Sequence, residues 1–187
     1  MRDMFSNFFE LGFDHIVQSA GWDHLVFIIA LLAPFPLKNW KGWLAAISAF
    51  SLAHTLAMAL QAMAKWPVPT LILEWTVWST LIFTSGRLVW LKGVYTPKTK
   101  LWILAGLFGL VHGAAFWSEA SIMLEGQSGF WELWLGFTMG IECAQIAVVL
   151  SLFVLRGILE QLGWSAREIA LVLASMCLGV ALHLAFQ

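Results

Sequence analysis

The chain has 187 residues, of which 60% are hydrophobic and only 11% are charged. A soluble domain usually carries about 25% charged residues, so the composition excludes an ordinary soluble protein. It predicts an integral membrane protein with one transmembrane domain, residues 1–187. The net charge of -1, without a run of lysine or arginine, excludes a basic nucleic-acid-binding surface. Two cysteines in apolar segments predict neither a disulfide framework nor a cysteine metal motif.

Residues 5–16 place aromatic and aliphatic side chains at helical spacing, with polar residues opposite. This pattern predicts an N-terminal helix that lies in the membrane interface or re-enters the bilayer. The first apolar segment, about 21–36, is short compared with the roughly 20 residues that a full span needs. We therefore expect either the preceding helix to extend it or a protein-lined region to surround it. Pro34 and Pro36 predict its end, because proline cannot donate the helical hydrogen bond.

Five further apolar segments follow, separated by residues that favour turns: 42–63, 69–91, 100–118, 130–155 and 166–186. We therefore predict an all-α membrane protein, a bundle of about six transmembrane helices. Basic residues concentrate in the loops after the first, third and fifth segments and at the adjoining helix ends, namely Lys38, Lys41, Arg87, Lys92, Lys98, Lys100, Arg156 and Arg167. The opposite side has only Arg2 and Lys65. The positive-inside rule thus predicts that both termini lie outside.

Imidazole and carboxylate side chains interrupt the apolar segments, where their burial is costly unless they find partners. His15, Asp23 and His24 come immediately before the first apolar run, at its expected outer mouth. The later segments contribute His54, Glu74, His112, Glu142 and His183. With the predicted orientation, these groups lie towards the outer side, and Glu142 lies near mid-depth. We expect them to share a pocket that opens to the exterior.

Neutral imidazole nitrogens and carboxylate oxygens together suit a divalent transition metal such as nickel, cobalt or zinc. The predicted metal ligands are His15, Asp23, His24, His54, Glu74, His112 and Glu142. Ser51 and Thr55 flank His54 and could orient its ring. Gln145 shares a helix face with Glu142 and could hold it by a hydrogen bond. His183 is a more remote supporting candidate.

These residues also have purely structural explanations. Asp23 is a favoured type for a helix N-cap, which would leave His24 as an interfacial residue. A single intramembrane histidine such as His54 or His112 is often a hydrogen-bonded packing residue. Glu74 could simply be solvated near the interface. Glu142 is the hardest to explain in this way, because a central carboxylate costs about 2.5–3.5 kcal/mol even on lenient insertion scales.

Two pairs of glycines predict close contacts between helices. Gly136 and Gly140 form a GxxxG sequence, whose usual role is tight helix packing and which could also support a homo-oligomer. Gly109 and Gly113 flank His112 and would let another helix approach it closely.

Five stretches of the chain together resemble the HupE/UreJ family of small bacterial membrane proteins. They are GFDHIVQSAGWDHLVFIIALL, AFSLAHTLAMAL, the Glu74 segment after a proline-containing loop, FGLVHGAAFW and LGFTMGIECAQIAVV. The resemblance implies about six helices in the bacterial inner membrane and nickel or cobalt uptake linked to hydrogenase and urease. It also implies that the polar positions of the family here are His15, Asp23, His24, His54, Glu74, His112, Glu142 and Gln145.

Three functions are compatible with these residues. In a divalent metal permease, the cation would pass from the outer mouth to His54, His112 and Glu142. In an intramembrane zinc-type hydrolase, three histidines would hold the metal while Glu142 or Glu74 acts as base. A metal-binding receptor without turnover is the third. The resemblance favours the permease, whereas a polar cluster on one side of an apolar bundle suits the enzyme better.

Overall fold

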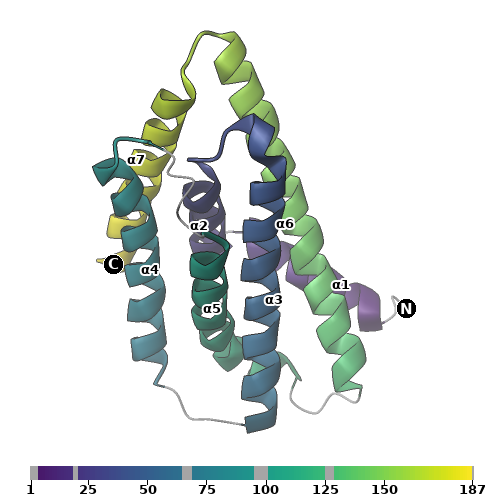
Figure 1. Cartoon of the computed structure of the whole chain (residues 1–187). Helices are drawn as coiled ribbons and strands as arrows, with labels where there is room; N and C mark the ends of the chain where they lie inside the picture. The colour runs from purple at the N-terminus through teal and green to yellow at the C-terminus, as the bar shows by residue number, and fades with distance from the viewer. Residues whose placement is uncertain (1–3, 19–20, 65–68, 95–100, 125–128, 187) are drawn as a thin grey trace.

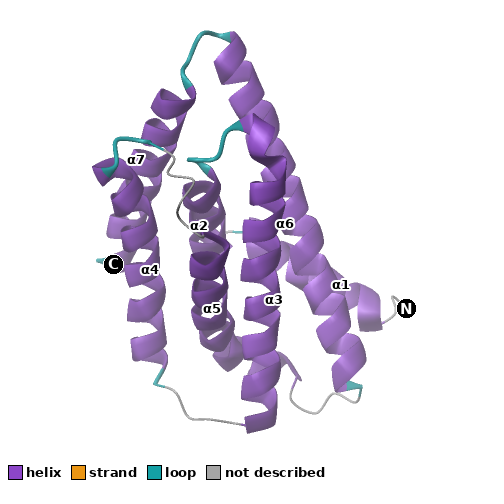
Figure 2. Cartoon of the chain, viewed as in Figure 1, coloured by secondary structure: helices purple, strands orange, loops and turns teal. Residues whose placement is uncertain are grey.

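A computed structural model describes residues 4–18, 21–64, 69–94, 101–124 and 129–186. Within these residues the chain forms seven α-helices, with 3-10 helix η2 (Leu37–Asn39) before α3, and no strand (Figure 2). The helices are α1 (Met4–Val17), α2 (Trp22–Leu32), α3 (Trp40–Ala64), α4 (Thr70–Trp90), α5 (Leu101–Leu124), α6 (Phe130–Gln161) and α7 (Ala166–Ala185). The predicted all-α class is confirmed, and each predicted apolar segment coincides with one helix.

Within the described residues, three helices are long and apolar enough to cross a bilayer: α3, the Trp131–Gln161 part of α6, and α7. Helices α1 and α2 pass the same test together, as one span bent by 63°. A shorter apolar helix, Leu101–Trp117, forms most of α5. The number of spans and the outside location of both termini stay predictions.

Helix α2 occupies the centre of the bundle and contacts α1, α3, α4, α6 and α7 (Figure 1). Most of its residues are buried, which is typical of a helix enclosed by others; they include Val26, Phe27, Ile28, Leu31 and Leu32. Eleven residues of helix extend only about 16 Å, roughly half of a bilayer core. The helix is therefore shorter than the predicted segment 21–36 and ends before Pro34, as the prolines predicted.

Glycines bring two pairs of helices into backbone contact. A Cβ atom at Gly140 of α6 would lie 2.1 Å from the Phe9 carbonyl oxygen of α1, and one at Gly12 of α1 would lie 2.1 Å from the Phe137 carbonyl oxygen. On the other side of the bundle, a Cβ at Gly113 of α5 would lie 2.1 Å from the His54 carbonyl oxygen of α3. The predicted close packing is confirmed. The Gly136–Gly140 pair faces α1 of the same chain, so the predicted homo-oligomer, which stays a prediction, would need another surface.

A buried arginine ties the end of α2 to the junction between α6 and α7. The Arg156 side chain is 3% exposed and donates to the Ala33 carbonyl oxygen at 2.8 Å and the Ala166 carbonyl oxygen at 3.3 Å. It also pairs with Glu160 at 3.0 Å. A cation at a helix C-terminus satisfies a carbonyl that has no partner within the helix and interacts favourably with the helix dipole. Arg156 thereby fixes the far end of α2.

We predict that Gly140→Ala destabilises the protein, because the new methyl group would collide with the backbone of α1. Overpacking of this kind costs about 1–3 kcal/mol. The control is Gly157→Ala on the same helix, where a Cβ meets nothing within 4 Å and the better helix propensity of alanine adds up to about 1 kcal/mol. Thermal unfolding and SDS-induced unfolding in detergent measure the stability of both variants. Equal stability of the two variants would contradict the packing described here.

Candidate metal centre

Three histidines from three helices meet inside the bundle. Each of His15, His24 and His54 offers one ring nitrogen, and these nitrogens lie within 4.8 Å of one another. His15 is in the last turn of α1, His24 is in the first turn of α2, and His54 is near the middle of α3. The break between α1 and α2 therefore creates the cluster, because it brings two histidines that are nine positions apart to the same point.

Glycine at position 21 makes this break possible. A Cβ atom there would lie 1.9 Å from the carbonyl oxygen of His15, so any other residue would push the start of α2 away from the end of α1. Gly21 is the N-cap of α2. Its backbone amide donates to the Gln18 carbonyl oxygen at 2.9 Å, which closes a tight turn between the two helices. The sequence contained this signal, since Gly21 stands between the two histidine-bearing segments, but its role was not predicted.

Asp23 fixes the tautomer of His24. Its carboxylate oxygen accepts from the His24 ring Nδ1 at 2.7 Å and from the His24 backbone amide at 2.8 Å. Because a carboxylate accepts only, Nδ1 carries the proton and Nε2 presents its lone pair. A carboxylate behind a histidine is the usual way in which proteins orient a metal-binding imidazole. The alternative role of Asp23 as an N-cap is wrong, because Gly21 holds that position.

The Nε2 atoms of His24 and His54 face each other at 3.4 Å. This is long for an N–H···N hydrogen bond, whose usual range is about 2.7–3.2 Å. It is close to the separation of roughly 3.3–3.4 Å between two nitrogens that share a tetrahedral ion with bonds of about 2.0–2.1 Å. One pair of donors therefore already has the spacing that a metal ion requires.

His112 brings a fourth imidazole to the cluster from α5. Its ring centroid lies 5.4 Å from that of His24. Its Nδ1 donates to the Phe108 carbonyl oxygen at 2.8 Å, so Nε2 again presents the lone pair. This Nε2 atom is buried without a hydrogen-bond partner among the described residues. His112 is thus positioned and protonated as a ligand would be, although it lies outside the closest group of three.

Aromatic rings enclose the imidazoles. The Phe116 ring lies 3.9 Å from the His15 ring and stacks on Phe137 at 5.1 Å, measured between centroids. Phe27 lies 5.4 Å from His112, and Phe50 lies 6.1 Å from His24. An apolar shell of this kind limits access of water to a site and lowers its dielectric constant. The sequence did not reveal Phe116 as part of the site, although it stands one helical turn after His112.

Glu142 contacts α3 one turn away from His54 but does not belong to the close group of three imidazoles. The Ser51 hydroxyl, one turn before His54, donates to the Glu142 carboxylate. Thr55 instead donates to the Ser51 carbonyl oxygen at 3.0 Å. The two hydroxyls therefore do not orient the His54 ring as predicted. Gln145 is fully buried, but its side-chain atoms have no hydrogen-bond partner in the described part of the chain, so it does not hold Glu142.

The structure places the remaining predicted residues differently. Glu74 and His183 are exposed on α4 and α7, and neither belongs to the close group of imidazoles. His24 is only 3% exposed, so it lies within the bundle; its location at the outer mouth stays a prediction.

We predict that Asp23→Asn weakens metal binding by about 10–100-fold, because the amide no longer fixes the His24 tautomer. The control is Glu74→Gln, which removes an exposed carboxylate and should leave affinity unchanged. Titration of Ni²⁺ or Co²⁺ into protein in lipid nanodiscs measures both variants, with thermal unfolding of the metal-free protein as a check on folding. A larger loss in Glu74→Gln than in Asp23→Asn would contradict the site described here.

Comparison with known proteins identifies a family for this chain. The family model described as HupE / UreJ protein matches residues 1–186, essentially the whole chain. No curated protein shows a significant match, and no solved structure does. The stretches that carry His15, His24, His54 and His112 all fall within the matched region. The chain belongs to the HupE/UreJ family.

Proposed function

We propose that the chain is a divalent transition-metal permease of the nickel or cobalt type, with His15, His24 and His54 as the core of its binding site. The observation that carries this proposal is the convergence of three imidazole nitrogens from three helices within 4.8 Å. Membership of the HupE/UreJ family supports it. The metal ion is the cargo in this proposal, bound and released during each cycle.

The donor set suits a doubly charged ion of intermediate softness. Imidazole is a ligand for nickel, cobalt and zinc, whereas magnesium and calcium prefer oxygen donors alone. The lone pairs on His24 and His112 face the interior because their other ring nitrogens are already hydrogen-bonded. Asp23 behind His24 and Glu142, which accepts from Ser51 one turn before His54, would balance the two positive charges of the ion. Such a balance matters because an uncompensated charge in an apolar bundle is costly.

Movement of the ion requires a change in the helix arrangement. On the Arg156 side of the imidazoles the core is apolar and includes Phe27, Leu31 and Phe50. Discontinuous helices commonly form the binding sites of secondary transporters, whose repeats or bundles rock around a fixed site. In this chain the bent helix pair α1–α2 is such a discontinuous helix. In our proposal, α2 shifts relative to α3 and opens the cluster alternately to the two sides.

An intramembrane zinc hydrolase is the second candidate. Three imidazoles with an open fourth position, close to a carboxylate, are the components of catalytic zinc sites. The apolar core on one side of the cluster favours this alternative, because an enzyme needs access from one side only. A metal receptor without turnover would use the same site.

We place the protein in the bacterial inner membrane as a multi-pass protein with one domain. The family match through residues 1–186 supports a single domain, and the apolar helices support a bilayer location. The outside position of both termini remains part of this proposal and rests on the distribution of basic residues.

Flux assays in proteoliposomes test the permease. With a metal-sensitive dye inside the vesicles, we expect Ni²⁺ or Co²⁺ entry that falls at least tenfold in His54→Ala and Glu142→Gln. His183→Ala, which changes an exposed histidine outside the cluster, should transport like the unaltered protein. Stoichiometric metal binding without flux would overturn the permease in favour of the hydrolase or receptor. Absence of metal binding would overturn all three.

A further inference from the structure

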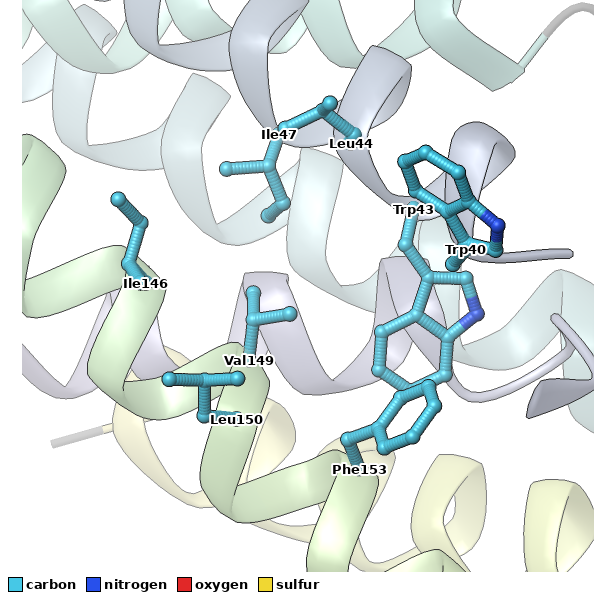
Figure 3. Close-up of a pocket in the computed structure, with 8 residues that line it drawn as sticks. All are labelled: Trp40, Trp43, Leu44, Ile47, Ile146, Val149, Leu150 and Phe153. Atoms are coloured by element: carbon cyan, nitrogen blue, oxygen red, sulfur yellow. The ribbon is translucent and has the colours of Figure 1, made fainter.

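An apolar groove of about 260 Å³ lies between α3 and α6, separate from the imidazole cluster. Figure 3 shows its lining, which comes from the first two turns of α3 and the middle of α6: Trp40, Trp43, Leu44, Ile47, Ile146, Val149, Leu150 and Phe153. All eight residues are apolar or aromatic. At its base, the Trp43 and Phe153 rings meet edge to face, with centroids 5.5 Å apart.

The groove opens on the outside of the bundle. Trp40, Leu44 and Leu150 are 57%, 58% and 59% exposed, and they belong to two helices that are apolar enough to span a bilayer. Exposed side chains on such helices face the acyl chains of the lipid. The occupant of the groove must therefore come from the membrane, and the choice is between a lipid chain and a helix of a second protein.

The apolar lining of the groove suits a lipid chain. An acyl chain is a thin, flexible cylinder without polar groups, and it can fill the space between Leu44 and Leu150 along its length. Filling an apolar void gains the dispersion contacts that the lining residues otherwise lack.

Positive charge marks the end of the groove where α3 begins. The Lys41 ammonium lies 5.7 Å from the centre of the Trp40 ring, which lines the groove. Lys38, in η2 directly before α3, is also exposed. Glu160, beyond the groove on α6, is paired with Arg156 at 3.0 Å. Tryptophan and lysine at a helix end are typical of the headgroup region, where lysines attract anionic lipids.

We propose that this groove binds one acyl chain of an anionic phospholipid, whose phosphate lies beside Lys41 and Lys38. The chain runs from Trp40 towards Ile47 and Ile146. Ile47 is one helical turn from Ser51, and Ile146 is one turn from Glu142, so the bound lipid fills the space directly next to the Ser51–Glu142 hydrogen bond. The lipid site itself needs no metal ion.

Native mass spectrometry of the detergent-purified chain tests this proposal with two lipids that share the same acyl chains, phosphatidylglycerol and phosphatidylcholine. We expect one phosphatidylglycerol molecule retained per chain in preference to phosphatidylcholine. Leu150→Trp fills the groove and should abolish this retention. Leu107→Trp, at a residue of α5 that is 55% exposed and outside the groove, should not. Because the readout is lipid mass, it is independent of the proposed metal transport.

The charge contribution is tested separately. Lys41→Gln should lower phosphatidylglycerol retention about fivefold, the change expected for one lysine at an anionic surface, while Lys92→Gln at the end of α4 should leave it unchanged. Equal retention of the two lipids by the unaltered chain would overturn the proposal. So would lipid retention by a folded Leu150→Trp chain, or a groove occupied by a second copy in a retained dimer. If Leu150→Trp does not fold, the lysine variants decide the proposal: equal phosphatidylglycerol retention by Lys41→Gln and Lys92→Gln would overturn it.

Discussion

A neutral imidazole inside an apolar bundle must find a partner for one N–H donor and one lone pair, and four such rings meet at the junction of α1, α2, α3 and α5. Asp23 and the Phe108 carbonyl oxygen satisfy the donors of His24 and His112. Three buried ring nitrogens, on His15, His54 and His112, have no hydrogen-bond partner among the described residues. Each costs about 1–3 kcal/mol, and their sum is comparable with the whole stability of a typical protein, about 5–15 kcal/mol. On His54 the unpartnered nitrogen is Nδ1, whereas Nε2 faces His24. A cation that takes up the lone pairs of His15 and His112 offsets their share of this cost, which supports the proposed metal binding.

The architecture delivers these rings through backbone contacts that only glycine permits. Gly21 allows α2 to begin beside the end of α1, so that His15 and His24 point to the same place. Gly12 and Gly140 dock α1 on α6, and Gly113 docks α5 on α3 next to His54 and His112. Arg156 holds the opposite end of α2 through the Ala33 carbonyl oxygen. The site is therefore supported at both ends of its central helix.

Much of this arrangement was predictable because it depends on local patterns. Apolar runs predicted the helices, Pro34 and Pro36 predicted the end of α2, and Gly140 predicted a close helix contact.

The features that the sequence did not predict correctly also have physical causes. A hydropathy pattern cannot distinguish the entry of a chain into the bilayer from a break between two helices, so the role of Gly21 in that break was not predicted. A hydroxyl next to a histidine in sequence can turn to either neighbouring helix, and Ser51 bonds to Glu142. Glu74 was named as a metal ligand together with Glu142, because an isolated carboxylate does not reveal which side of its helix faces the core.

X-ray absorption spectroscopy of the purified chain loaded with one equivalent of Ni²⁺ or Co²⁺ tests the central claim most directly, because it reports the atoms bound to the metal. We expect at least three nitrogen ligands at about 2.0–2.1 Å, with the outer-shell scattering of imidazole rings, and a loss of one imidazole in His54→Ala. A first shell of oxygen atoms alone, unchanged by His54→Ala, would contradict the account.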